Sequence, residues 1–298
     1  IASLLNNVGT IVSQIALNIN AITLNNQQDA YIQSTGNLTA AVDKTITNNG
    51  TIASTGQATL TANALDNNQE AIMQLSGPTS LKVESLVNNK GNITTGDATM
   101  TAAAINNQLD ATIQSTGNLQ LIANSGIINN DGLFAANGDV TTTAVTLNNN
   151  AKATIQAGGT SILTAHNKVN NKGSIAGNNS TITTSQLANT GNVKLNNNLA
   201  INTTDLINKA ILSGHNVTLD TGATINNTAQ GQIQATNTLK ITTSDNVINE
   251  GLISADHTIV DAKSVTNQGH DGLFVQRILE MATTGNIINQ GGALIYSI

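Results

Sequence analysis

The ionisable side chains that could do chemistry are concentrated towards the end of the chain. The densest acidic stretch consists of Asp245, Glu250, Asp256, Asp261 and Asp271. Enzymes that cleave polysaccharides use paired carboxylates as general acid and base, and the two must come from neighbouring segments of the fold. These residues therefore raise the hypothesis of a carbohydrate-active enzyme.

Two Asp–His pairs, at 256–257 and 270–271, are separated by less than one repeat of the chain, and Arg277 follows them as the only arginine. Together they could face one groove. The carboxylates are nevertheless scattered, and isolated charged side chains normally point into solvent. We therefore expect outward-facing, solvated groups here and no catalytic residues. The segment 269–272 departs from the usual turn and predicts a local protrusion.

Metal and cofactor motifs are missing from the sequence. Cysteine is absent, and the four histidines (His166, His215, His257 and His270) show neither an i, i+4 pair nor zinc spacing. The glycine-rich nonapeptide of calcium-binding β-rolls is absent as well. We therefore predict no metal site and no cofactor site.

The composition restricts the possible partners. Charged residues make up 9% of the 298 residues, the net charge is −6, and only two Phe, two Tyr and no Trp are present. Nucleic-acid binding needs basic side chains for phosphates or aromatic rings for base stacking, so no nucleic-acid partner is expected. The sequence contains no run of about 18 apolar residues, so it predicts no transmembrane helix.

The elements that position these groups repeat with a fixed period. A regular series of fifteen asparagines, at intervals of 18 to 22 residues, has an Ile, Leu or Val two residues earlier. A fixed period of this size is typical of stacked repeats. The asparagines are Asn7, Asn26, Asn48, Asn67, Asn88, Asn107, Asn129, Asn149, Asn171, Asn189, Asn208, Asn227, Asn249, Asn267 and Asn289.

One repeat, residues 46–62, shows what each unit should fold into. Apolar and polar residues alternate with period two, which predicts β-strands. Gly50 and Gly56 interrupt the alternation where the chain must turn. A second, longer version of the repeat has extra residues directly after the asparagine, as in 24–36. The two versions alternate through most of the first half, which predicts a bulge on every second coil along one edge.

Stacked coils of three short strands predict a right-handed parallel β-helix, that is, an all-β solenoid of about 15 coils. One coil per strand spacing of about 4.8 Å gives a rod roughly 70 Å long. We expect one continuous β-helix over residues 1–298, as part of a much larger protein. Exposed coil edges at either end would favour end-to-end self-association.

The repeated asparagine faces the same side as the apolar residue before it, so its amide should point inwards at a corner. An unpaired buried amide is costly. Stacked on identical amides, it can donate and accept hydrogen bonds along a ladder. We therefore predict a structural asparagine ladder formed by the fifteen residues above.

The segments 45–56 and 247–255 resemble the haemagglutinin repeats of filamentous-haemagglutinin-type proteins of Gram-negative bacteria. Both follow the pattern Leu-x-Asn-x-Gly-x-Ile closely, and the resemblance covers essentially the whole chain. Individual coils drift, since Ala210 stands where the pattern has glycine.

The resemblance implies a secreted or outer-membrane-surface adhesin, or an effector of contact-dependent growth inhibition. It implies export through an outer-membrane two-partner secretion transporter, and a target-cell receptor or glycan as partner. The prediction is a non-catalytic rod segment that mediates adhesion or presents a distal binding or toxin region. The alternatives are a carbohydrate-active β-helix enzyme and a local receptor- or glycan-binding module within the shaft.

Overall fold

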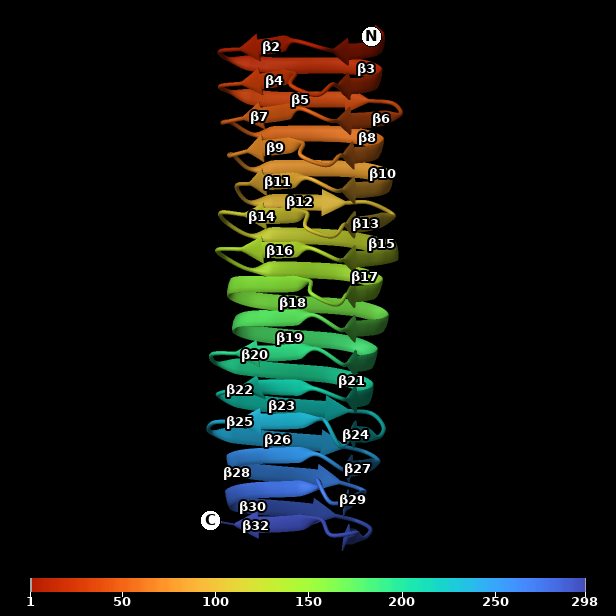
Figure 1. Cartoon of the computed structure of the whole chain (residues 1–298), viewed down its shortest axis with the longest axis vertical. Helices are drawn as coiled ribbons and strands as arrows, with labels where there is room; N and C mark the ends of the chain where they lie inside the picture. Colours follow the sequence, from red (N-terminus) through yellow and green to blue (C-terminus); the bar gives the residue numbers. More distant parts are fainter. Residues whose placement is uncertain (1, 298) are drawn as a thin grey trace. The chain divides into compact units, whose positions relative to one another are not determined.

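The computed structural model describes residues 2–297, which form strands and turns and include no helix. Among these residues, no helix of sufficient length and apolarity to span a membrane is present. The chain divides into two compact units, residues 1–145 with 152–159 and residues 146–151 with 160–298. Each unit is a stack of coils (Figure 1).

The strands are short and follow one another at regular intervals. Those of the first unit are β1 (Ala2–Asn7), β2 (Thr10–Ser13), β3 (Ala16–Asn26), β4 (Tyr31–Ser34), β5 (Asn37–Val42), β6 (Thr45–Asn48), β7 (Thr51–Ser54), β8 (Ala58–Asn67), β9 (Ile72–Leu75), β10 (Thr79–Asn89), β11 (Asn92–Thr95), β12 (Ala98–Thr101), β13 (Ala104–Asn107), β14 (Thr112–Ser115), β15 (Leu119–Asn130) and β16 (Leu133–Ala136). Two strands have residues in both units, namely β17 (Val140–Asn149) and β18 (Thr154–Asn171). Those of the second unit are β19 (Ser174–Asn189), β20 (Asn192–Leu195), β21 (Asn198–Asn208), β22 (Ile211–Gly214), β23 (Asn216–Thr221), β24 (Ile225–Asn227), β25 (Gln232–Ala235), β26 (Thr238–Thr243), β27 (Asn246–Asn249), β28 (Leu252–Ala262), β29 (Ser264–Gln268), β30 (Leu273–Thr283), β31 (Ile287–Gln290) and β32 (Leu294–Ser297).

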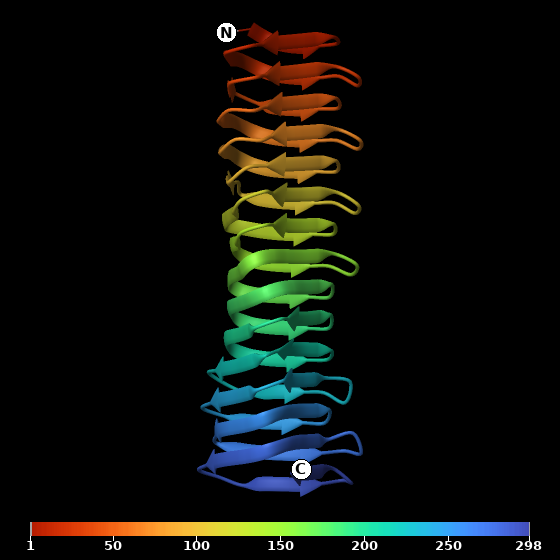
Figure 2. The same ribbon diagram turned by 90° about the vertical axis from the view of Figure 1, so that its left-hand side faces the viewer.

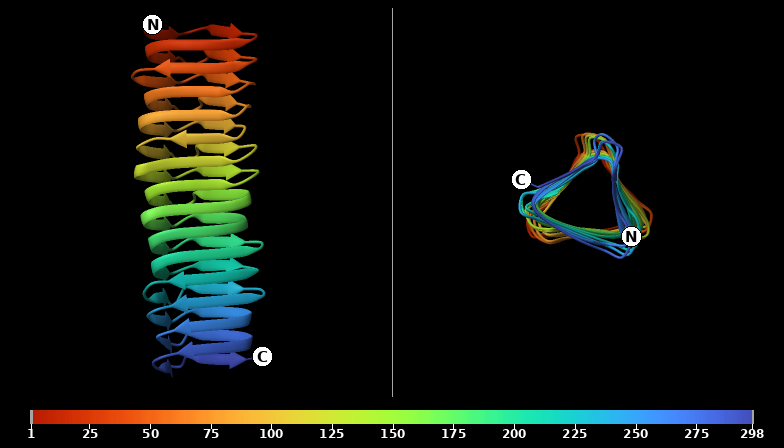
Figure 3. Two further views of the ribbon diagram at one scale, coloured as in Figure 1. Left: turned by 180° about the vertical axis from the view of Figure 1, so that it is seen from behind. Right: turned by 90° about the horizontal axis from the view of Figure 1, so that it is seen from below.

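Within each unit, every coil pairs in parallel with the coils above and below it. Along one face of the first unit, β4 pairs with β7, β7 with β9, β9 with β11 and β11 with β14. Viewed along the stack, the three faces of a coil form a triangle (Figure 3). The prediction of an all-β solenoid with a parallel sheet and about 15 coils is confirmed, while its right-handed sense and its continuity over residues 1–298 stay predictions.

The core consists of inward side chains stacked in columns, because the period of two along each strand turns alternate residues to the inside. Equivalent positions in successive coils are in register, so apolar residues lie directly over one another. One column of the first unit is Ile32, Ile52, Met73, Ile93, Ile113 and Phe134, each at most 1% exposed. Its counterpart in the second unit is Ile175, Val193, Leu212, Ile233, Ile253 and Phe274.

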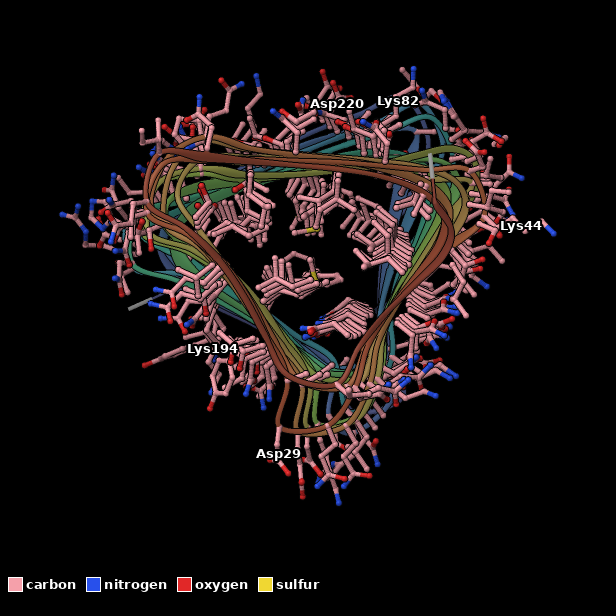
Figure 4. The ribbon with its side chains drawn as sticks, turned by 90° about the horizontal axis from the view of Figure 1, so that it is seen from above. Asp29, Lys44, Lys82, Lys194 and Asp220 are labelled. Atoms are coloured by element: carbon pink, nitrogen blue, oxygen red, sulfur yellow. The ribbon has the colours of Figure 1, made fainter. Side chains whose placement is uncertain are left out.

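One corner of the coil exists in a short and a long form, as the repeat lengths predicted. In the first unit the long corners at 27–29, 68–70 and 108–110 alternate with two-residue corners, and they project further (Figure 2). The long corner at 27–29 is closed by a hydrogen bond from the Ala30 amide to the Gln27 carbonyl, 3.1 Å long. Its tip, Asp29, points away from the coil (Figure 4).

In the first unit, each short corner in the coil directly after a long corner requires a glycine. A side chain at Gly50 would overlap the carbonyl oxygens of Ala30 and Gln27 from the neighbouring long corner. Gly91 and Gly132 meet the corresponding carbonyls of the next two long corners in the same way. At these positions glycine therefore allows one backbone to approach another closely.

We predict that Gly50→Ala lowers the free energy of unfolding by about 1–3 kcal/mol, because the added methyl group forces the two corners apart. The matched control is Gly9→Ala, since Gly9 holds the same place in its coil but has no atom within 4 Å of an added Cβ. Thermal unfolding followed by circular dichroism measures both. Equal losses in the two variants would contradict this account of the corner.

Candidate functional site

The most extensive arrangement of polar groups inside the first unit is a ladder of asparagine amides at the corner described above. Each Nδ2 donates to the Oδ1 of the asparagine in the next coil, at 2.8–2.9 Å. The rungs are Asn7, Asn26, Asn48, Asn67, Asn89, Asn107 and Asn130.

The second unit contains a ladder of the same construction. Its amides donate in the same chain direction, with Nδ2–Oδ1 distances of 2.7–2.8 Å. The rungs are Asn149, Asn171, Asn189, Asn208, Asn227, Asn249, Asn267 and Asn289. Every rung of this unit except Asn289 is buried.

The same amides hold the backbone of the corner. Asn107 Nδ2 lies 2.9 Å from the Oδ1 of the next rung and also within hydrogen-bond distance of the Ala111 and Leu133 carbonyls, at 3.2 and 3.1 Å. One amide group therefore contacts its own corner and the corner of the next coil. Because these groups are buried, an unpaired amide in this place would lose about 1–3 kcal/mol.

The sequence-based prediction misplaces two of the fifteen rungs by one residue. The rungs are Asn89 and Asn130, which are fully buried, whereas Asn88 and Asn129 point outwards and bond to Asp66 and Asn106 at 3.1 and 2.9 Å. The other thirteen asparagines lie in the two ladders.

The error comes from two apolar residues in succession. In Leu86-Val87 either residue could be the inward one, and a one-residue slip turns every side chain of a strand to the other face. The structure buries Val87 and leaves Leu86 partly exposed. The number of residues between the asparagine and the next glycine distinguishes the two candidates. Asn48 and Asn89 both stand two residues before the corner glycine, whereas Asn88 stands three residues before it.

The acidic stretch near the end of the chain forms pairs rather than one site. Arg277 Nε and Nη2 donate to the two carboxylate oxygens of Asp256, both at 2.8 Å. The hydrogen bond from Arg277, followed by its charge, lowers the pKa of the exposed Asp256 carboxyl, and the pair raises the pKa of Arg277. Exposed pairs of this kind contribute little to stability.

Other ionisable residues of that stretch form separate contacts. His257 Nε2 lies 2.7 Å from a carboxylate oxygen of Glu280, and Lys263 lies 3.6 Å from Asp245. His270 and Asp271 are on the long corner after β29, where the Gly272 amide donates to the Gly269 carbonyl at 3.2 Å. In residues 2–297 no group of three or more His, Asp or Glu side chains could hold a metal ion. Among the described residues, the acidic stretch thus forms separate ion pairs at the surface.

Comparison with known proteins identifies the repeat. A family model described as haemagglutinin repeat matches residues 2–62, 174–222 and 212–294, more than half of the chain. No curated protein and no solved structure matches the chain.

We predict that Asn107→Ala lowers the free energy of unfolding by about 1–3 kcal/mol, because the amides and carbonyls bonded to it stay buried without a partner. Asn106→Ala is the control, since the partly exposed Asn106 side chain on the same strand accepts a single hydrogen bond, from Asn129 Nδ2, whose loss should cost about 0.5–1.5 kcal/mol. Chemical denaturation of both variants measures the difference. Unchanged stability of Asn107→Ala would show that this rung is not needed.

A second prediction concerns the Asp256–Arg277 pair. Since the folded-state pKa of Asp256 is depressed, the stabilisation from this pair is present above the unfolded pKa and is lost as pH falls through the folded pKa. In Arg277→Gln the carboxyl should titrate at higher pH than in the parent chain, as measured by NMR on the side-chain carbon. Lys263→Gln serves as control and should leave that pKa unchanged. A pKa that is the same in the parent chain and in Arg277→Gln would contradict the assignment.

Proposed function

This chain belongs to the haemagglutinin-repeat family, and on that premise we propose that it is a non-catalytic shaft segment of a large secreted or surface-exposed protein. The observation that carries the proposal is the use of the polar side chains. In both units the buried amides bond from coil to coil, so the most regular chemistry of the chain serves stacking. The family itself is a structural and adhesin family.

A shaft role follows from how contacts are distributed. In each unit a coil pairs only with its neighbours, as in other solenoids, so stability grows by adding coils. Such a stack can carry a functional region at a distance without taking part in its chemistry. This supports a rod that presents a distal receptor-binding or toxin region, either as an adhesin or as an effector of contact-dependent growth inhibition.

The partners of the full-length protein follow from the same proposal. Export proceeds through an outer-membrane two-partner secretion transporter of a Gram-negative bacterium, with the finished protein on the cell surface or released. Coils that form one after another outside the cell would help to draw the chain through the transporter. The distal region then meets a target-cell receptor or glycan.

We also propose that residues 1–298, taken by themselves, associate end to end. The inward residue Ile287 is 49% exposed in the last coil, although Val265 at the same place one coil earlier is fully buried. Open coil edges with exposed apolar residues pair readily with further strands. Sedimentation velocity over a range of concentrations should therefore show reversible association, and a strictly monomeric chain would remove this part of the proposal.

Small-angle scattering tests the shaft role. We expect a radius of gyration clearly above the roughly 20 Å of a compact 298-residue globule, together with β-rich circular dichroism. Measurements are made at several concentrations and extrapolated to zero, so that association does not enter the result. A compact radius would overturn the proposal, and release of soluble products from acidic polysaccharides would favour the enzymatic alternative.

A further inference from the structure

The corner that carries the long loops forms a notched ridge in the first unit. The long corners project further than the short ones between them (Figure 2), and a hollow lies at each short corner. We define notch 1 as the hollow between the long corners 27–29 and 68–70, floored by Asn49 and Gly50. It is lined by Gln28, Asp29, Tyr31, Asn49, Gly50, Thr51, Gln69, Glu70 and Ile72.

We propose that notch 1 binds a neutral linear glycan along the ridge. The inference goes beyond the shaft role and does not depend on it. It rests on three features of the notch: an exposed aromatic ring, converging amide and carboxylate groups, and strand backbone at Tyr31 and Ile72 whose amides and carbonyls are already bonded.

The aromatic ring belongs to Tyr31, which is 48% exposed at the edge of β4. The chain has four aromatic residues, and both phenylalanines are buried in the core. The Tyr31 side chain is instead half-exposed at the surface. Ile72, two coils on in the same outward column, is 41% exposed. A ring and an aliphatic side chain in one column offer an amphipathic surface to the C–H face of a sugar.

The polar groups come from the two long corners. Asp29 and Glu70 provide carboxylate acceptors, while Gln28 and Gln69 provide amides that donate and accept. Sugar hydroxyls also donate and accept, so these groups suit them. Asp29 and Glu70 adopt positive φ values of 60° and 65°. Asp110 and Lys152 adopt the same conformation at the next long corners, at 63° and 71°, so this conformation is a property of the long corner and not of notch 1 alone.

The backbone of the notch excludes recognition by strand addition. The Tyr31 amide donates to the Gly9 carbonyl and its carbonyl accepts from Asn7 Nδ2, at 2.8 and 2.9 Å. The Ile72 amide and carbonyl are bonded in the same way, at 2.9 and 3.0 Å. An extended peptide would need free backbone groups to pair with. A ligand must therefore be held by side chains, as a sugar is.

Charge decides the class of glycan. The described residues that line notch 1 include two carboxylates and no basic side chain, so a sulfated or carboxylated sugar would be repelled. The neighbouring notches contain Lys90 and Lys152, each beside acidic residues. Notch 1 is thus the one best suited to a neutral sugar.

The spacing favours a linear polymer over a single sugar. Successive long corners are two coils apart, about 10 Å at the usual strand spacing, which is comparable to the length of a disaccharide. The notches repeat along the first unit at this spacing. One chain of sugars lying along the ridge could therefore contact Tyr31 and the carboxylates beyond it at equivalent positions.

The test is titration calorimetry of the full chain with three neutral hexasaccharides, built from glucose, mannose or N-acetylglucosamine in linear linkage, and with a heparin-derived hexasaccharide. At least one neutral probe should bind saturably and more tightly than the heparin probe. Tyr31→Ala should weaken that binding about 3- to 10-fold, the loss of an aromatic contact worth about 0.5–1.5 kcal/mol. Glu70→Gln should weaken it as well, since it removes a charged acceptor.

Tyr296→Ala is the matched control, because Tyr296 is 50% exposed on the last strand, outside the notch. The affinity of Tyr296→Ala for the neutral probe should equal that of the parent chain. Circular dichroism of all three variants verifies the fold. No binding of any neutral probe, tighter binding of heparin, or an equal loss in Tyr296→Ala would overturn the inference. A chain with β-rich circular dichroism and a large radius of gyration that binds no glycan would leave the shaft proposal intact.

Discussion

The interaction on which the structure depends is the hydrogen bond between buried asparagine amides of successive coils. Each amide would be costly to bury alone, and the next coil supplies the partner that makes its burial acceptable. In both units the donors point in the same chain direction, so a coil shifted by one residue along its strand would lose its rung. We infer that the ladder keeps the coils in register, which the apolar columns alone would enforce less strictly because Ile, Leu and Val can replace one another at small cost.

The ladder also shapes the outer surface. Because each amide bonds to backbone carbonyls of its own corner and of the following one, the corner loops are held in place at their base. Loops of two lengths can then alternate without disturbing the stack, provided that glycine stands in the short corner of the coil directly after a long corner. The notched ridge of the first unit is the outcome of this rule, and Tyr31 is positioned there by a bond from Asn7 to its carbonyl. Structural and binding roles are therefore compatible on the same coil.

The ionisable residues illustrate the opposite case. Asp256, His257 and Arg277 lie close enough in sequence to suggest an acid–base cluster, yet the stacking of coils pairs Asp256 with Arg277 and His257 with Glu280 at the surface. Exposure to water then limits what these pairs contribute. The family to which the chain belongs is consistent with a role in architecture and adhesion.

The sequence by itself determined the length of the coil, the class of fold and the alternation of long and short corners. It could do so because these properties are local: the period of two within a strand, the position of Gly50, and the extra residues after Asn26 are all read within one repeat. Only the tertiary structure decided that Arg277 pairs with Asp256 and that Tyr31 and Ile72 line one notch. The physical reason is that these features depend on how one coil seats on the next. That seating joins residues about 20 to 40 positions apart, which no local pattern specifies.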